Sequence, residues 1–262
     1  MPTREEALRV AHRLHGLVGG PALTRKAAAR ELAKLDPIDA TELIHHLIHL
    51  AREGWEPATC VLASFVTALG MEAGQIPHAA SLKRLASLQA HDEVASLFAD
   101  GPARQQMDER AAAKADAKKF SESLGHLKQK ARSTTNPDEL SKLATASDPT
   151  VVRNVLLNPR LTEALVVRVA AKRPARPEPL LEIWKSARWS VRHAVRRALV
   201  FNPYLPPEVG AKIVPLLNAT DLAELARDTG VHPALRAAAK LLLTQTREKR
   251  KQAKVRNGGP LS

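Results

Sequence analysis

The sequence contains one cysteine, Cys60, and this restricts the chemistry open to the chain. A single thiol excludes a disulfide within the chain, a cysteine-rich zinc site and a cysteine-ligated iron–sulfur cluster. Cys60 lies in the apolar segment CVLASFV, where we expect a small core residue rather than a nucleophile.

Aromatic residues and glycine are also scarce. Aromatics make up 3% of the sequence, and 12 of its 262 residues are glycine. The apolar residues are mostly Ala, Leu and Val, and Ala, Leu, Arg, Lys and Glu are among the residues that lose least on entering a helix. No sustained alternation of β-branched residues is present. The composition therefore predicts an all-α fold.

Long apolar runs are absent as well. No run approaches the roughly 20 residues that a membrane-spanning helix needs. The first residues, MPTREEALRV, carry charge where a signal peptide would have an apolar core. We therefore expect no membrane span and a cytoplasmic location.

Positive charge is plentiful but unevenly distributed. Residues 1–102 carry 10 Lys and Arg against 12 Asp and Glu, whereas residues 103–136 carry 8 against 4. Residues 137–246 carry 16 against 10, and residues 247–262 carry 6 against 1. The basic second half suggests an anionic partner, and a basic surface that only confers solubility is the alternative.

Residues 1–102 are expected to form a domain of short helices. Asp39 is the predicted N-terminal cap of a helix that ends at Gly54. Pro57 then opens the segment ATCVLASFVTALGM, which is apolar on nearly every face. This second helix should lie at the centre of the core.

A charged connection, residues 103–136, is expected to follow. It is rich in Ala and Lys, and its apolar residues recur at spacings of three and four, as in one narrow helical seam. The seam consists of Ala113, Ala117, Phe120, Leu124, Leu127 and Ala131. We predict a connecting helix, with a loosely ordered linker as the alternative because Ala contributes little burial.

An Asn-Pro pair recurs through the second half, beginning at Asn136, Asn158 and Asn202, at intervals of 22 and 44 residues. The segment RNVLLNPRL aligns with RALVFNPYL at the longer interval. Asn tolerates the left-handed backbone that often ends a helix, and the proline then prevents continuation. The pattern predicts stacked short helices over residues 137–246, followed by a disordered basic tail, residues 247–262.

The segment SDPTVVRNVLLNPRLTEALVVRVA resembles the leucine-rich repeat variant family and, more broadly, HEAT-like helical repeats. The resemblance rests on Asp148-Pro149, Val152-Arg153, Asn158-Pro159 and Leu161. It covers about residues 137–246 and implies a helical solenoid with a binding surface, but it names no ligand. The expected architecture is thus an N-terminal helical bundle followed by a HEAT-like or leucine-rich-repeat-variant-like solenoid.

The segment ELIHHLIH places Glu42, His45, His46 and His49 on the polar side of a predicted helix. His45 and His49 are one turn apart, a spacing that can hold one metal ion. No third ligand is identifiable, although His12 and His15 are candidates to approach in space. A solvated or partner-facing polar side is the leading interpretation. A metal site and histidines buried between helices remain open.

A second candidate site lies in EIWKSARWSVRHAVRRALVF. If a helix begins at Trp189, then Val191, Ala194, Val195, Ala198 and Leu199 form its buried side. Arg188, Arg192 and Arg196 then form a basic stripe suited to phosphates or carboxylates. The full candidate surface is Lys185, Arg188, Arg192, Arg196, Arg197, Arg153, Lys172, Arg173 and Arg176. Internal pairing of these cations with Glu178, Glu182 and Glu208 is the equally open alternative.

Helical repeats with neighbouring Trp and Arg are similar to the HEAT-like alkylpurine DNA glycosylases. That resemblance implies that Trp184 and Trp189 surround an exposed base, with Asp148 or Asp221 as the acidic residue. Core anchoring is the alternative role for both tryptophans. The sequence contains no Gly-rich phosphate loop, serine nucleophile elbow or motif-placed carboxylate pair.

The leading functional hypothesis is a non-enzymatic binding or scaffold protein without a cofactor. Its basic C-terminal surface would bind an acidic protein or nucleic acid. Protein is slightly favoured because few aromatics are available to stack on bases. A DNA-processing enzyme of the glycosylase type is the alternative.

Overall fold

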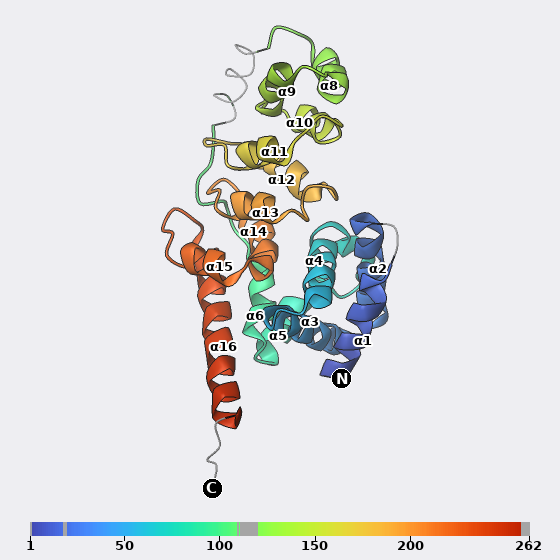
Figure 1. Ribbon diagram of the computed structural model, residues 1–262, viewed down its shortest axis with the longest axis vertical. Coiled ribbons are helices and arrows are strands. Elements are labelled where there is room, and N and C mark those ends of the chain that lie inside the picture. The colour runs from blue at the N-terminus through green and yellow to red at the C-terminus, as the bar shows by residue number, and fades with distance from the viewer. Residues whose placement is uncertain (1, 18–19, 109, 111–119, 258–262) are drawn as a thin grey trace. The chain divides into compact units, whose positions relative to one another are not determined.

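The computed structural model describes residues 2–17, 20–108, 110 and 120–257, and this part of the chain contains helices and no strand (Figure 1). The all-α prediction is therefore confirmed. The chain divides into two compact units. The bundle unit comprises residues 1–99, 211–229 and 233–262, and the repeat unit comprises residues 100–210 and 230–232. Within the described residues, no helix combines the length and apolar character needed to cross a membrane.

In the described residues, the bundle unit is built from α-helices with short 3-10 turns between some of them. The α-helices are α1 (Arg4–His15), α2 (Pro21–Lys34), α3 (Pro37–Arg52), α4 (Glu56–Met71), α5 (Leu82–Leu88), α6 (Asp92–Ala95), α15 (Ala219–Leu225) and α16 (Pro233–Asn257). The 3-10 turns are η1 (Ala73–Gln75), η2 (Ser96–Phe98) and η3 (Val214–Leu216).

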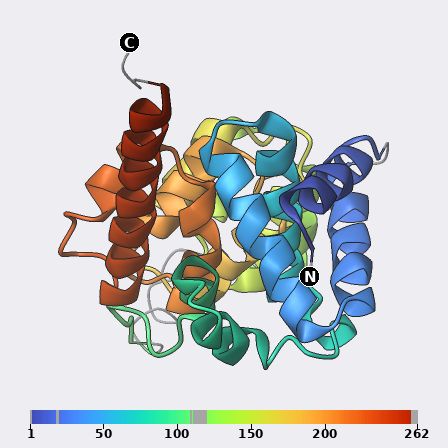
Figure 2. The same cartoon turned by 90° about the horizontal axis from the view of Figure 1, so that it is seen from below.

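Helix α4 is the centre of the bundle, as its apolar sequence predicts. It packs against α1, α2 and α3 (Figure 2). Its Phe65 side chain is completely buried. Gly54 lies in the connection between α3 and α4 and has a φ of 89°, a backbone angle that suits glycine. Cys60 lies on the exposed side of α4, so its expected place in the core is wrong.

Helix α3 begins three residues earlier than predicted. The side chain of Asp36, rather than that of Asp39, accepts hydrogen bonds from the Ile38 and Asp39 amides. Pro37 then occupies the first turn, where the missing amide hydrogen costs nothing. Asp39 lies in the first turn of the helix, where its negative charge interacts favourably with the positive end of the helix dipole.

The C-terminal residues belong to the bundle unit. Helix α16 packs against α15, η3 and α6, and the Arg52 guanidinium of α3 donates to the Leu217 carbonyl at 2.8 Å. Residues 211–229 and 233–246, which were predicted from the sequence to belong to the repeat region, lie in the same compact unit as residues 1–99. The tail predicted as disordered from residue 247 continues α16 to Asn257, and residues 258–262 lie outside the described part.

The helices of the repeat unit form two rows. They are α8 (Leu124–Ser133), α9 (Pro137–Ala144), α10 (Pro149–Leu156), α11 (Glu163–Ala170), α12 (Pro177–Lys185), α13 (His193–Val200) and the start of α14 (Pro207–Ile213). One row joins α8 to α10 and α10 to α12, and the other joins α9 to α11 and α11 to α13. Helices next to one another in sequence therefore alternate between the rows.

The connection over residues 103–136 is not one helix. Residues 101–108 and 120–123 are irregular, and helical structure resumes in α8. Leu127 and Ala131 of the predicted seam are buried, whereas Leu124 is 44% exposed. Ala113 and Ala117 lie outside the described residues.

Asn158 connects the end of α10 to the end of α8. Its side chain is fully buried, and its amide donates to the carbonyls of Ala131 and Thr134 at 3.0 Å each. Its side-chain oxygen accepts from the Arg160 amide at 2.8 Å, which fixes the turn around Pro159. Because the last carbonyls of a helix have no partner within it, Asn158 supplies the missing donors.

Asn202 makes the equivalent contacts 44 residues later. Its amide donates to the carbonyls of Ala170 and Lys172, at the end of α11, and its oxygen accepts from the Tyr204 amide. Neither asparagine has the predicted left-handed backbone. Among the described non-glycine residues, positive φ occurs at Ala90. Asn136 differs again, since it caps the N-terminus of α9.

Candidate functional site

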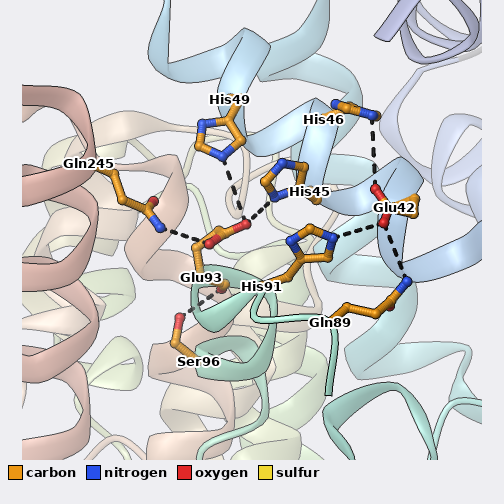
Figure 3. A network of polar contacts seen from close by, with 9 residues as sticks. All are labelled: Glu42, His45, His46, His49, Gln89, His91, Glu93, Ser96 and Gln245. Carbon is orange, nitrogen blue, oxygen red and sulfur yellow. Dashed lines mark hydrogen bonds and ion pairs between the residues drawn. The ribbon is translucent and has the colours of Figure 1, made fainter. Parts of the chain in front are cut away.

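A cluster of histidines and carboxylates lies within the bundle unit (Figure 3). Helix α3 contributes four of the side chains, and the α5–α6 turn, α6 and α16 contribute the others. We call this set the histidine cluster: Glu42, His45, His46, His49, Gln89, His91, Glu93 and Gln245.

The α5–α6 turn is shaped so that His91 and Glu93 face α3. Ala90 adopts a left-handed backbone with a φ of 56°. The Ala90 amide donates to the Ser87 carbonyl, and the His91 amide donates to the Ala86 carbonyl. This pair of bonds is a Schellman motif, which reverses the chain directly after a helix. Glu93 then lies in the first turn of α6.

Glu93 is the buried centre of the cluster, with 1% of its side chain exposed. One carboxylate oxygen, Oε1, contacts Nδ1 of His45 and lies 3.8 Å from Nε2 of His49. The other oxygen, Oε2, accepts a hydrogen bond from Gln245 at 2.8 Å. Burial alone would raise the pKa of Glu93, but the bonds from His45, Gln245 and its own backbone amide lower it to about 2.

A second carboxylate, Glu42, holds the other side of the cluster. Its Oε1 lies 3.0 Å from Nε2 of His91 and accepts from Gln89 at 3.3 Å. The His91 ring stacks on the His45 ring with 4.0 Å between centroids. The two carboxylates therefore orient two stacked imidazoles from opposite sides.

The predicted polar side of α3 is not a solvated face. The side chains of Glu42, His45, His46 and His49 are between 13% and 24% exposed, because other parts of the bundle unit cover them. Burial lowers the pKa of His46, and the neighbouring His45 lowers it further. Of the three interpretations given above, histidines buried between helices matches the described contacts.

Sequence reasoning missed His91, Glu93 and Gln245. The adjacent letters HDE at residues 91–93 were the available signal, but nothing local indicates that they face α3. His12 and His15, the predicted candidates, are not among the side chains of the cluster. His12 instead packs edge-on against Trp55 at 4.8 Å, and His15 is exposed.

The cluster has the composition of a metal centre. Ligand atoms of His45, His91 and Glu93 all lie within 4.8 Å of one another. Within the described residues, these three form the group of His, Cys, Asp or Glu side chains that lie close enough together to hold an ion. The predicted pair, His45 and His49, is thus only partly the set that the fold brings together.

The second candidate site, the basic stripe, does not form as predicted. Helix α13 begins at His193 rather than Trp189, so Arg188 and Arg192 lie in the preceding turn. Arg196 is 9% exposed, and its Nε donates to the Ser190 carbonyl. Val191 is 40% exposed, although the prediction placed it on the buried side.

Several of the predicted cations bond to the repeat unit itself. Lys172 donates to the Thr145 carbonyl at 2.7 Å, and Arg173 donates to the Phe201 carbonyl. Arg176 pairs with Glu178 at 3.1 Å, and the Arg197 guanidinium lies over the Phe201 ring. These contacts agree in part with the internal pairing given above as the alternative.

Four predicted cations are exposed, and two of them pair with one buried acid. Glu182 of α12 accepts two hydrogen bonds from Arg153 of α10, at 2.6 and 2.9 Å, and lies 3.4 Å from Lys185. The Arg153 and Lys185 side chains are 58% and 54% exposed, whereas that of Glu182 is 7% exposed. Arg188 and Arg192 are exposed in the adjoining turn.

Trp189 anchors that turn to the end of α10. The indole is 3% exposed and donates to the Leu156 carbonyl at 3.1 Å, while Arg188 stacks on its ring at 4.5 Å. Leu157, the residue directly after α10, is 57% exposed. The bond from Trp189 thus brings the turn that carries Arg188, Val191 and Arg192 to the end of α10, which Leu157 follows. We call the exposed residues of these segments the basic-apolar patch: Arg153, Lys185, Arg188, Arg192, Leu157 and Val191.

The residues compared with glycosylases have structural roles. Trp184 and Trp189 are each 3% exposed, so both tryptophans are core anchors rather than a surface for a base. The Asp148 carboxylate caps the N-terminus of α10, and Asp221 lies in the first turn of α15.

No protein-family model matches the chain, and no curated protein or solved structure is significantly similar to it.

Proposed function

We propose that the chain is a non-enzymatic helical-repeat protein of the HEAT-like or leucine-rich-repeat-variant-like kind, acting in the cytoplasm. In this proposal, the repeat unit binds an acidic segment of a partner protein through the basic-apolar patch. The observation that supports the proposal is that four exposed cations and the exposed Leu157 and Val191 occur on α10, at the end of α12 and in the turn that Trp189 ties to the end of α10.

The charge of the patch favours an acidic partner. Arg153 and Lys185 pair with the buried carboxylate of Glu182, and Arg188 and Arg192 are exposed in the turn that follows α12. The whole stretch of residues 100–210 carries 20 Lys and Arg against 12 Asp and Glu, so its field also attracts anions. Arginine binds carboxylates in bidentate fashion, which adds directional recognition to this attraction.

The apolar part of the patch favours a protein over nucleic acid. Leu157 and Val191 offer surface that an aliphatic side chain can cover, whereas a phosphate backbone cannot. Neither tryptophan is exposed to stack on an unpaired base. An acidic segment that also carries leucine or isoleucine side chains therefore fits the chemistry of both components.

The rigidity of the patch supports its role in binding. Trp189 and the Arg153–Glu182 pair hold the α12–α13 turn and α10 in fixed positions before any partner arrives. A preformed surface loses less conformational entropy on association than a mobile one.

The proposal is tested by fluorescence anisotropy with three labelled probes. The first is a peptide of alternating Glu and Leu, the second has Ser in place of Leu, and the third is duplex DNA. We expect the Glu-Leu peptide to bind most tightly and to weaken as salt is added. If duplex DNA binds more tightly than the Glu-Leu peptide, the nucleic-acid alternative replaces this proposal.

A further inference from the structure

We propose that the histidine cluster binds a divalent transition-metal ion, with His45, His91 and Glu93 as its ligands and zinc as the best-matched ion. This inference concerns the bundle unit and does not depend on the basic-apolar patch of the repeat unit.

The donor set matches zinc by its chemistry. Two imidazole nitrogens and one carboxylate oxygen are ligands that zinc accepts in proteins, and three protein ligands leave one position for water or a further side chain. His49 is placed to supply that fourth ligand, because its Nε2 lies 3.8 Å from Oε1 of Glu93.

The three ligand atoms are already gathered, since they lie within 4.8 Å of one another. Ligand atoms around a tetrahedral zinc lie about 3.3 Å apart, as metal–ligand distances of about 2.0 Å require. His45 and Glu93 are in direct contact, so their ligand atoms must separate to admit the ion.

The outer contacts are those that orient metal ligands. Glu42 engages Nε2 of His91, which leaves Nδ1 of that ring for the metal. Gln245 engages Oε2 of Glu93, which leaves Oε1 on the side of His45 and His49 (Figure 3). A carboxylate behind His91 and an amide behind Glu93 thus orient two of the three ligands, and such outer contacts raise metal affinity.

The competing explanation is a network that is complete without metal. The contact between His45 and Glu93 then serves only to satisfy a buried carboxylate. The two explanations differ in what zinc does to the protein. A metal-binding cluster takes up one equivalent of zinc with saturation, and a purely structural network takes up none.

The test is equilibrium dialysis of the full chain, purified without a histidine tag, against buffered zinc, with metal content measured by mass spectrometry. The variants are His91→Ala, which removes a ligand, and Glu42→Gln, which keeps the size of the orienting side chain. The exposed His15→Ala is the matched control. Circular dichroism in zinc-free buffer establishes that each variant is folded.

We expect one zinc per wild-type chain and unchanged affinity in His15→Ala. Glu42→Gln should bind zinc about 10- to 100-fold more weakly, as outer-contact changes at metal sites do. His91→Ala should lose more affinity than Glu42→Gln. The proposal is overturned if the wild-type chain binds no zinc. It is also overturned if Glu42→Gln and a folded His91→Ala both bind zinc as tightly as His15→Ala does.

Discussion

Side chains that donate to the carbonyls at helix C-termini recur throughout the repeat unit. Asn158 and Asn202 do so from the turns after α10 and α13, and Trp189 does so at the end of α10. Lys172 and Arg173 bond in the same way to Thr145 and Phe201. Sequence alone identified the two asparagines as important but gave them the wrong role, because their partners lie 24 to 32 residues away.

Replacing Asn158 by Ala should destabilise the repeat unit by about 2–3 kcal/mol, because buried carbonyls at the end of α8 lose their donor. Hydrogen exchange should increase for amides of α8 and α10. Asn154→Ala is the control, since Asn154 makes only a local bond to Thr150 in its own helix. Equal losses in the two variants would contradict the role given to Asn158.

Glu182 should make the stability of the repeat unit depend on pH. The hydrogen bond from Arg153 lowers the pKa of Glu182 below its ordinary 4.5, and burial opposes this shift. A lowered pKa contributes stability above about pH 4.5, and that stability is lost as pH falls through the folded-state pKa. Glu182→Gln should therefore cost about 1 kcal/mol at neutral pH.

The difference in unfolding free energy between wild type and Glu182→Gln should shrink as the solution is acidified. Urea titrations at several pH values measure it. A difference that stays constant from neutral pH down to about pH 3 would show that the carboxylate charge contributes nothing.

At the scale of elements, the sequence predicts helix positions well where apolar periodicity is strong. The central helix α4 and its opening proline were predicted correctly, because the segment is apolar on most faces. The start of α13 was not, because arginines at a spacing of four suit a helix and a turn alike. What holds that turn is the distant bond from Trp189 to Leu156, which no local pattern contains.

The histidine cluster was predicted only in part, because some of its members lie far from α3 in the sequence. Its α3 side chains share one helix face, so their grouping is visible in the spacing of Glu42, His45 and His49. His91 and Glu93 join them only through the α5–α6 turn, whose reversal depends on a left-handed alanine. Alanine gives no sequence signal for that conformation, whereas glycine would have.

Replacing Ala90 by Gly should stabilise the bundle unit by about 1 kcal/mol. Ala90 is exposed and has a φ of 56°, a backbone that glycine adopts without the steric cost borne by other residues. Thermal unfolding measures the gain. Ala80→Gly, in a nearby turn without positive φ, is the control and should give no gain. A lower melting temperature for Ala90→Gly would contradict the strain assigned to this turn.

At the scale of the whole molecule, the chain combines two units with different chemistry. The bundle unit gathers histidines and carboxylates inside, and the repeat unit carries cations and apolar side chains on its exterior. Net charge drew attention to the repeat unit from the sequence alone. Which cations are available for a partner became visible only when the internal bonds of Lys172, Arg173 and Arg196 were known.

The central claim, that the basic-apolar patch binds an acidic protein segment, is tested most directly by titrating the Glu-Leu peptide into matched variants. Arg188→Ala with Arg192→Ala removes two charges from the patch, and Leu157→Ser with Val191→Ser removes its apolar part. Lys142→Ala with Arg168→Ala removes two charges from exposed positions on α9 and α11. We predict that each patch variant binds at least about tenfold more weakly, equivalent to about 1.4 kcal/mol. The α9–α11 variant should stay near wild type, and equal weakening in all three variants would contradict the claim.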